Sequence, residues 1–214
     1  MNLRKIAKNN YLKFSYFDGS QHIASEYAIY KLLKITRKFR ISSVLEVGLG
    51  IGSISNTILT NSTNGDMFYV GTESNLFCLE SLKKNLNEKV YNSLVIVPSI
   101  DKVIELKKKF DLVIIDGSYD SILNLVNHVE SNAIIAIEGD RLTQVDDLKK
   151  MFPKAKFVHS ISLKKNDLNG VGLPGHWQGG IKLLLLNPNN YQLVFYLTEK
   201  IRTKLIYIYR KYLT

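Results

Sequence analysis

Three glycines alternate with other residues at Gly48, Gly50 and Gly52, directly after the apolar run 44–47, in which Glu46 is the acidic residue. A tight turn from a strand into a helix needs backbone angles that glycine adopts easily, and bare backbone lets a ligand approach closely. The phosphates of a dinucleotide would meet like charge at Glu46, whereas a cationic ligand would be favoured there. The pattern therefore predicts a cofactor loop for a ligand that carries positive charge.

A second acidic residue and the glycine spacing narrow the class of cofactor. The dinucleotide pattern G-x-G-x-x-G would require a glycine at the position of Ser53. Glu73 follows Gly52 by 21 residues, at the end of the next expected strand, where a carboxylate accepts hydrogen bonds from ribose hydroxyls. The alternative is that Glu73 caps the helix that begins near Asn75. With Glu46, this arrangement favours S-adenosylmethionine, with its sulfonium and ammonium groups, over a nicotinamide cofactor.

Residues 43–186 resemble the class I S-adenosylmethionine-dependent methyltransferases, and most of all the O-methyltransferases of small molecules and sugars. The fourth strand of those enzymes ends in an I-D-G motif, which is Ile115-Asp116-Gly117 here. Enzymes that methylate amino nitrogens of bases usually carry an N-P-P-Y-like motif at this place, and Asp116-Gly117-Ser118-Tyr119 contains no proline. The resemblance implies methyl transfer to a hydroxyl of a small molecule or glycan, with Asp116 at the cofactor and in the catalytic centre.

The resemblance also indicates where adenine would bind. In the family an acidic or polar side chain after the third strand commonly meets the adenine amino group, and Ser99 occupies that place. Ser99 stands where an aspartate is common, and Ile100 is expected to pack on the ring. Asp101 is interpreted as the N-cap of the following helix.

Many relatives with the I-D-G motif bind Mg²⁺ through the fourth-strand aspartate and an acidic pair after the fifth strand. The corresponding residues here are Asp116, Glu138 and Asp140, which are hard oxygen ligands of the kind that Mg²⁺ prefers. Gly139 separates the two acids that are often adjacent in the family. The alternative is that Glu138 and Asp140 cap the helix around Thr143 and bind no metal.

Without a metal, a general base must take the proton of the acceptor hydroxyl. His176, in the loop between the last two expected strands, is the preferred candidate, with Trp177 as a surface for the acceptor. His22 is the other candidate, because N-terminal segments of this family often fold over the cofactor. His128 and His159 fall inside expected elements and are interpreted as packing residues.

The hydrophobic pattern alternates strands with helices, which predicts a doubly wound, Rossmann-like α/β fold. Its seven-stranded, mostly parallel sheet has helices on both faces and helical extensions at both ends. The expected strands are 43–47, 68–71, 94–97, 111–115, 133–137, 156–163 and 180–186, and the expected helices are 53–60, 76–86, 101–109, 121–128 and 143–151. Glu46, Glu73, Asp116 and Glu138 all fall at the carboxyl ends of strands, where such sheets bind ligands.

Length and charge divide the 214 residues into three expected parts. Residues 1–40 form an N-terminal helical segment that covers cofactor and acceptor, 41–190 form the S-adenosylmethionine-binding domain, and 191–214 form a basic amphipathic helix. The first part has nine Lys/Arg against two acidic residues and the last has five against one, whereas the middle has fifteen against sixteen. A single cysteine and an N-terminus without an apolar leader favour a cytoplasmic protein.

The C-terminal helix places Leu197, Ile201, Leu205, Ile208 and Tyr212 on one face at helical spacing. Such a helix can lie on the inner face of a membrane, form a homodimer contact or, most commonly, pack on its own sheet. The basic flanks also leave an RNA methyltransferase open, although no recognisable RNA-binding module accompanies them. A non-catalytic relative that retains S-adenosylmethionine binding is the third alternative.

Overall fold

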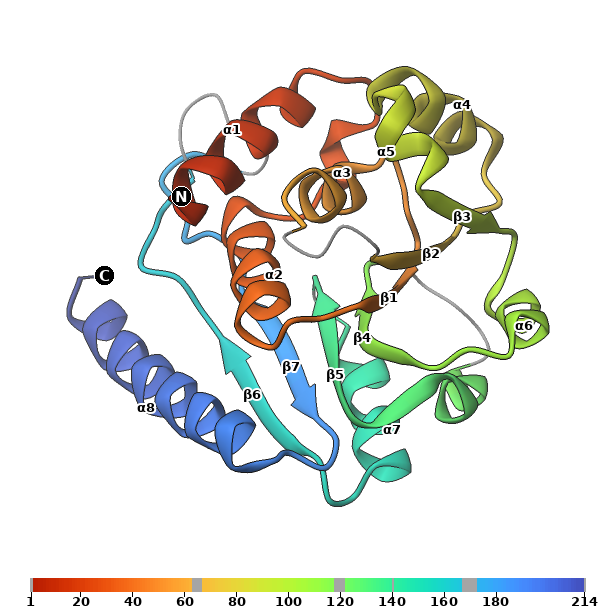
Figure 1. Cartoon of the computed structure of the whole chain (residues 1–214). Helices are drawn as coiled ribbons and strands as arrows, with labels where there is room; N and C mark the ends of the chain where they lie inside the picture. The colour runs from red at the N-terminus through yellow and green to blue at the C-terminus, as the bar shows by residue number, and fades with distance from the viewer. Residues whose placement is uncertain (1, 63–66, 118–121, 140, 167–172, 214) are drawn as a thin grey trace.

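The computed structural model describes residues 2–62, 67–117, 122–139, 141–166 and 173–213. Within these ranges seven strands form one sheet in the order β3-β2-β1-β4-β5-β7-β6 (Figure 1). The strands are β1 (Ser43–Val47), β2 (Phe68–Thr72), β3 (Leu94–Val97), β4 (Phe110–Ile115), β5 (Val129–Glu138), β6 (Lys156–Ser160) and β7 (Ile181–Leu185). The predicted seven-stranded, mostly parallel sheet is confirmed.

The direction of the strands gathers the carboxyl ends of β1, β2, β4 and β5 at one edge. These strands pair in parallel, while β7 is antiparallel to both β5 and β6. In register, Glu46 on β1 lies beside Gly71 of β2 and Ile114 of β4. Since side chains alternate between the two faces of a sheet, Glu46 shares a face with Ile114 and Ala136, and Glu138 continues that face along β5.

Helices cover both faces of the sheet, as buried parallel strands require. They are α1 (Leu3–Ser15), α2 (Glu26–Lys38), α3 (Ser53–Thr60), α4 (Leu76–Asn85), α5 (Glu88–Asn92), α6 (Ile100–Val103), α7 (Leu142–Met151) and α8 (Asn190–Leu213). One apolar cluster joins α1, α2 and α3 to one face, and a second joins α6 and α7 to the other. The face that carries Glu46 is the one covered by the two N-terminal helices.

Several predicted element boundaries differ from the structure. The prediction of one helix over 101–109 is wrong for its second half. There α6 passes into a 3₁₀ turn (Ile104–Leu106), and Lys107 adopts a left-handed φ of 48°. Described residues of the expected helix 121–128 form the 3₁₀ helix Ile122–His128. The strand expected over 156–163 ends at Ser160, and α5 was not predicted. Short 3₁₀ and helical segments lack the repeated apolar spacing that periodicity detects.

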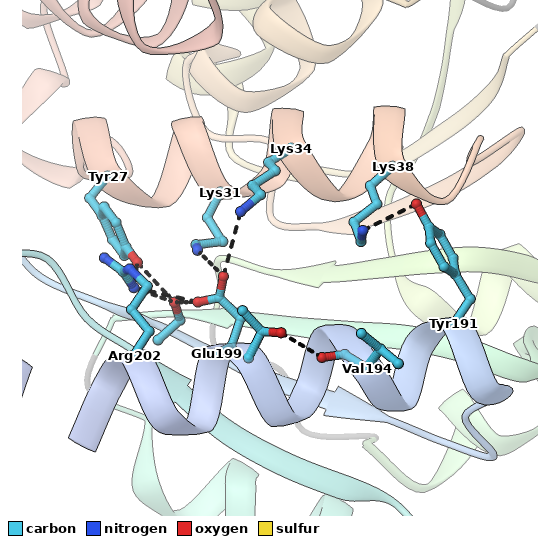
Figure 2. A network of polar contacts seen from close by, with 10 residues as sticks. Tyr27, Lys31, Lys34, Lys38, Tyr191, Val194, Glu199 and Arg202 are labelled. Atoms are coloured by element: carbon cyan, nitrogen blue, oxygen red, sulfur yellow. Dashed lines mark hydrogen bonds and ion pairs between the residues drawn. The ribbon is translucent and has the colours of Figure 1, made fainter. Parts of the chain in front are cut away.

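A buried polar network fastens α8 to α2 and β6 (Figure 2). Glu199 of α8 is 1% exposed, and its Oε1 lies 2.8 Å from the Lys31 Nζ of α2. Its Oε2 accepts a hydrogen bond from Ser160 Oγ at 2.8 Å and lies 3.4 Å from Arg202 Nη1. Arg202 also donates to the hydroxyl of Tyr27 at 2.6 Å. Each carboxylate oxygen of Glu199 therefore has at least one charged or hydroxyl partner.

Candidate functional site

The glycine loop after β1 adopts left-handed backbone angles at all three glycines, with φ of 89° at Gly48, 52° at Gly50 and 92° at Gly52. A Cβ on Gly48 would lie 2.8 Å from the backbone of Gly117, and one on Gly52 would lie 2.8 Å from Leu82 Cδ2. A Cβ on Gly50 would meet nothing within 4 Å. Packing therefore requires two of the glycines, whereas Gly50 presents its backbone to open space, as a ligand loop must.

Glu73 connects the glycine loop to the start of α4. Its Oε2 accepts the Gly50 N–H at 2.9 Å, and its Oε1 accepts the N–H groups of Ser74 and Asn75 at 2.9 and 2.8 Å. The alternative that Glu73 caps α4 is wrong, because Asn75 is the N-cap and its side chain accepts the N–H of Cys78. An ionised carboxylate has about four acceptor positions, so these three bonds leave room for a ribose hydroxyl. The predicted contact with ribose remains a prediction.

Glu46 is fully buried beneath the loop. Its Oε2 accepts a hydrogen bond of 2.5 Å from the hydroxyl of Tyr69, while its Oε1 has no hydrogen-bond partner among the described residues. Burial raises the pKa of Glu46 to about 8; the Tyr69 bond opposes this rise and the charge of Glu73 adds to it. A cation near this carboxyl would favour its ionised form, and the predicted role of Glu46 toward a positively charged ligand stays a prediction.

Asp116 and Glu138 lie at the carboxyl ends of the neighbouring strands β4 and β5, where each carboxyl shifts the pKa of the other. Burial raises the pKa of Asp116 well above its ordinary range, and the charges of Glu138 and Glu46 add to the rise. Burial also raises the pKa of Glu138. The N–H of Ser25, which donates to Glu138 Oε1 at 3.3 Å, opposes this rise. Two carboxyls this close favour a shared proton over two negative charges.

Arg141 is a residue of this site that the sequence analysis missed. Its Nη2 donates to the backbone oxygen of Asp116 at 2.7 Å and its Nε to that of Glu138 at 3.0 Å. The guanidinium therefore lies beside the carboxyl pair and acts against the rise of both pKa values. A usable signal existed, because arginine directly before the first turn of a helix opposes the helix dipole and needs another reason to be there.

A cavity of about 190 Å³ lies beside the glycine loop. It is lined by Gly50 of the loop, by Asn75 at the start of α4, by Asp116 and by His22. His22 belongs to the 3₁₀ turn η1 (Ser20–His22), which connects α1 to α2 and crosses the site. The N-terminal segment thus contributes to the same cavity as the glycine loop.

Comparison with known proteins identifies the fold. No protein-family model matches the sequence, and no curated protein is similar to it. Among solved structures, the chain is similar to the O-methyltransferase TomG from Streptomyces achromogenes, crystallised with S-adenosylmethionine. The two share 16% identity over 85% of this chain and 89% of that one, with a TM-score of 0.60. The chain is also similar to an O-methyltransferase from Bacillus cereus, crystallised with S-adenosylhomocysteine. These two share 13% identity over 86% of this chain and 90% of that one, with a TM-score of 0.57. The chain has the class I methyltransferase fold.

Ser99 and Ile100, the residues predicted to contact adenine, lie at the start of α6. Ser99 is the N-cap residue but makes no side-chain capping bond, and Ile100 is 5% exposed within the second apolar cluster. Neither residue lines the cavity beside Gly50, so their contact with adenine stays a prediction. The interpretation of Asp101 as the N-cap is wrong, since Asp101 lies inside α6 and accepts a hydrogen bond from Asn124.

His176 lies on the loop before β7, away from the cavity lining of this methyltransferase fold. Its side chain is exposed, and its backbone pairs with Asn166. The ring of the neighbouring Trp177 is contacted by two cations, with Lys165 Nζ at 5.0 Å and Arg210 Cζ at 4.8 Å from its centroid. The structure thus brings His22, and not His176, to the cavity with Asp116.

The predicted metal ligands fall partly within the described structure. Asp116 and Glu138 are brought together as a metal site would require, whereas Asp140 lies outside the described residues. Among the described residues, no group of three or more His, Cys, Asp or Glu side chains could hold a metal ion. The described residues therefore supply two oxygen ligands, next to the guanidinium of Arg141.

Proposed function

We propose that this protein transfers a methyl group from S-adenosylmethionine to a hydroxyl group of a small molecule or glycan. The observation that carries the proposal is the cavity shared by Gly50 and Asp116, with Gly50 open to a ligand and its N–H held by Glu73. The solved structures that resemble the chain add support, because their descriptions name O-methyltransferases with this cofactor or its product. A cytoplasmic location remains part of this proposal.

The cofactor would supply an activated methyl group on a sulfonium. The chain's own contribution is to hold the acceptor oxygen in line with that group, which accounts for most of the rate gain in such transfers. Glu46 would favour the positive charge from below the loop, and Glu73 would accept hydrogen bonds from the ribose. The acceptor oxygen would bond to the methyl carbon as the bond from that carbon to sulfur breaks, which leaves S-adenosylhomocysteine, and the acceptor proton would move to a base. Asp116, which lines the cavity and is coupled to Glu138, is the base that we propose.

The predicted magnesium ion is a second route for activating the acceptor. Asp116, Glu138 and Asp140 would hold it, and it would lower the pKa of a bound hydroxyl. In the route without metal, the charge of Arg141 opposes the rise of both pKa values and so favours an ionised carboxylate that can accept a proton. His22 is the alternative base, since it lines the same cavity. The two routes differ in whether Mg²⁺ changes binding and turnover.

The first experiment is calorimetry of S-adenosylhomocysteine binding, with and without Mg²⁺. Glu73→Ala should weaken binding by about 1–3 kcal/mol, the usual loss when buried hydrogen-bond partners go unmet. Glu88→Ala is the matched control, because Glu88 is an exposed glutamate near the start of the neighbouring helix α5. No binding of S-adenosylhomocysteine to the wild-type protein would overturn the proposal. Binding without turnover on any hydroxylated acceptor would favour the non-catalytic relative.

A further inference from the structure

The helix α8 exposes its apolar face instead of burying it. Val194, Leu197, Ile201, Leu205, Ile208 and Tyr212 recur every three or four residues, and their exposed fractions range from 47 to 82%. The opposite face packs against the protein through Phe195, Glu199, Thr203 and Ile206, all of which are buried. An amphipathic helix usually packs its apolar face on the protein and exposes its polar face. In α8 the apolar stripe faces outward along the whole helix instead.

The exposed charges of α8 are all positive. Lys200, Lys204 and Lys211 are exposed, and Arg202 and Arg210 are half-buried. Glu199 is the acidic residue of the helix, and its carboxylate is buried against Lys31 (Figure 2). The outward surface of α8 therefore combines a continuous apolar stripe with cationic edges and no opposing negative charge of its own.

A groove of about 970 Å³ lies next to this stripe, between α8, the N-terminal helices and the segment after β6. Its lining is mainly apolar and aromatic and includes Ile201, Leu205 and Tyr30. Arg4 lies at the groove with its guanidinium 5.4 Å from the Tyr30 ring centroid. The carboxylate of Glu26, also at the groove, forms an ion pair with Lys164. The groove thus continues the apolar surface of α8 and shares its positive charge.

The charges decide between possible occupants of this surface. Pairing of two α8 helices along the stripe would bring Lys204 and Lys211 of both copies to the edges of one seam, where like charges repel. A nucleic acid would be attracted by the lysines but offers nothing that covers an aliphatic stripe. A bilayer with anionic headgroups satisfies both features, because acyl chains cover the apolar residues while phosphates meet the cations. Tyr209 and Tyr212, both more than half exposed, suit the headgroup region.

We propose that the outward face of α8 and the adjoining groove dock on the surface of a bilayer rich in anionic lipids. The helix lies flat in the interface, since none of the described helices is long and apolar enough to cross a membrane. The aliphatic residues of the stripe, Val194, Leu197, Ile201, Leu205 and Ile208, enter the acyl boundary. Lys200, Lys204 and Lys211 contact headgroup phosphates, and the groove accepts part of an acyl chain. This docking does not depend on the proposed methyl transfer and is tested without cofactor.

The test is co-sedimentation of the full-length protein with vesicles. One preparation is phosphatidylcholine alone, and the other is an equal mixture of phosphatidylcholine and phosphatidylglycerol. The wild-type protein should sediment with the mixed vesicles and stay in the supernatant with phosphatidylcholine. Ile201→Gln with Leu205→Gln should lower the partition coefficient by roughly tenfold or more, because two aliphatic side chains no longer enter the boundary. Lys204→Glu with Lys211→Glu should lower it by a similar factor.

Matched controls separate this surface from general effects. Leu76→Gln with Leu142→Gln removes two exposed leucines elsewhere, at 76 and 62% exposure against 62 and 61% for Ile201 and Leu205. Lys83→Glu with Lys89→Glu gives the same change of net charge on α4 and α5. Both controls should sediment like the wild type. All four double variants change exposed side chains, and circular dichroism checks that each remains folded.

Three results would overturn the proposal. The first is that the wild-type protein fails to sediment with either kind of vesicle. The second is that the controls lose as much binding as the α8 variants, which would make the effect one of bulk charge or apolarity. The third is a wild-type dimer in gel filtration that Ile201→Gln with Leu205→Gln converts to a monomer, which would assign the stripe to a second copy.

Discussion

Two buried glutamates, Glu46 and Glu199, occupy opposite electrostatic situations in this molecule. At the edge of the sheet, burial raises the pKa of Glu46 to about 8, and Asp116 and Glu138 beside it are raised as well. Under α8, the pKa of Glu199 is lowered. Burial alone would raise it, but the charge and hydrogen bond of Lys31, together with Ser160 and Arg202, outweigh that effect. The residue type is the same and both are almost completely buried, so the difference comes from the partners.

The comparison contrasts the polar cluster that we propose binds a ligand with one that stabilises the fold. Glu199 has partners on both oxygens, whereas Glu46 retains an oxygen without one among the described residues. A buried polar group without a partner costs free energy, and such a cost is commonly found at binding sites. The network around Glu199 instead fixes the position of α8, whose outward face we propose to dock on a bilayer.

The largest expected effect is on stability when the Glu199 network is broken. Lys31→Met leaves a buried carboxylate without its closest cation, and removal of one partner of a buried pair typically costs about 3–5 kcal/mol. The free energy of unfolding from urea titration measures this loss. The double variant Lys31→Met with Glu199→Met should recover most of it, because no uncompensated charge remains. A loss below about 1 kcal/mol for the single variant would show that the network does not hold the fold together.

An effect of comparable size and opposite sign is expected for Glu46→Gln. The folded-state pKa of Glu46 is raised from its ordinary value of 4.5 to about 8, so the folded protein binds more protons than the unfolded chain between these pH values. Wild-type stability should therefore fall relative to the variant as pH rises from about 4.5 to about 8. The gap should grow by up to about 1.4 kcal/mol for each pH unit in this range, because one pKa unit corresponds to that much free energy. Melting curves of both proteins from pH 5 to pH 9 measure it, and a gap independent of pH would contradict the assignment.

The same carboxyl should report on the charge of the ligand. A cationic ligand near Glu46 favours its ionised form, so S-adenosylmethionine should release more protons on binding at pH 7 than S-adenosylhomocysteine, which lacks the sulfonium charge. The difference should be a fraction of one proton. Calorimetry in two buffers of different ionisation enthalpy measures the released protons. Equal release by both ligands, or an unchanged difference in Glu46→Gln, would place the sulfonium away from Glu46.

The smallest expected effect comes from the partly exposed member of the Glu199 network. Lys34 Nζ lies 3.7 Å from Glu199 Oε1, and its side chain is 39% exposed. Lys34→Met should change the free energy of unfolding by less than about 1 kcal/mol, because solvent screens such pairs. A loss comparable with that of Lys31→Met would mean that position matters less than total charge in this network.

The elements with long periodic patterns were predictable from the sequence. The strand 43–47 and the helix 53–60 were predicted with the bounds that the structure shows. The left-handed glycines follow from the same pattern, since the turn between strand and helix admits few other residues. Arg141 could not be found by periodicity, because its role depends on the backbone carbonyls of Asp116 and Glu138, which two separate strands bring together.

The sequence by itself determined the doubly wound sheet, the glycine loop and the amphipathic character of the last helix. Those features depend on spacing along the chain, which a single sequence contains in full. Only the tertiary structure decided that α8 turns its apolar stripe outward, because the choice of face depends on Lys31 and Ser160 as partners for Glu199. It likewise brought His22 to the cavity with Asp116, since contacts between distant segments depend on how the whole chain packs.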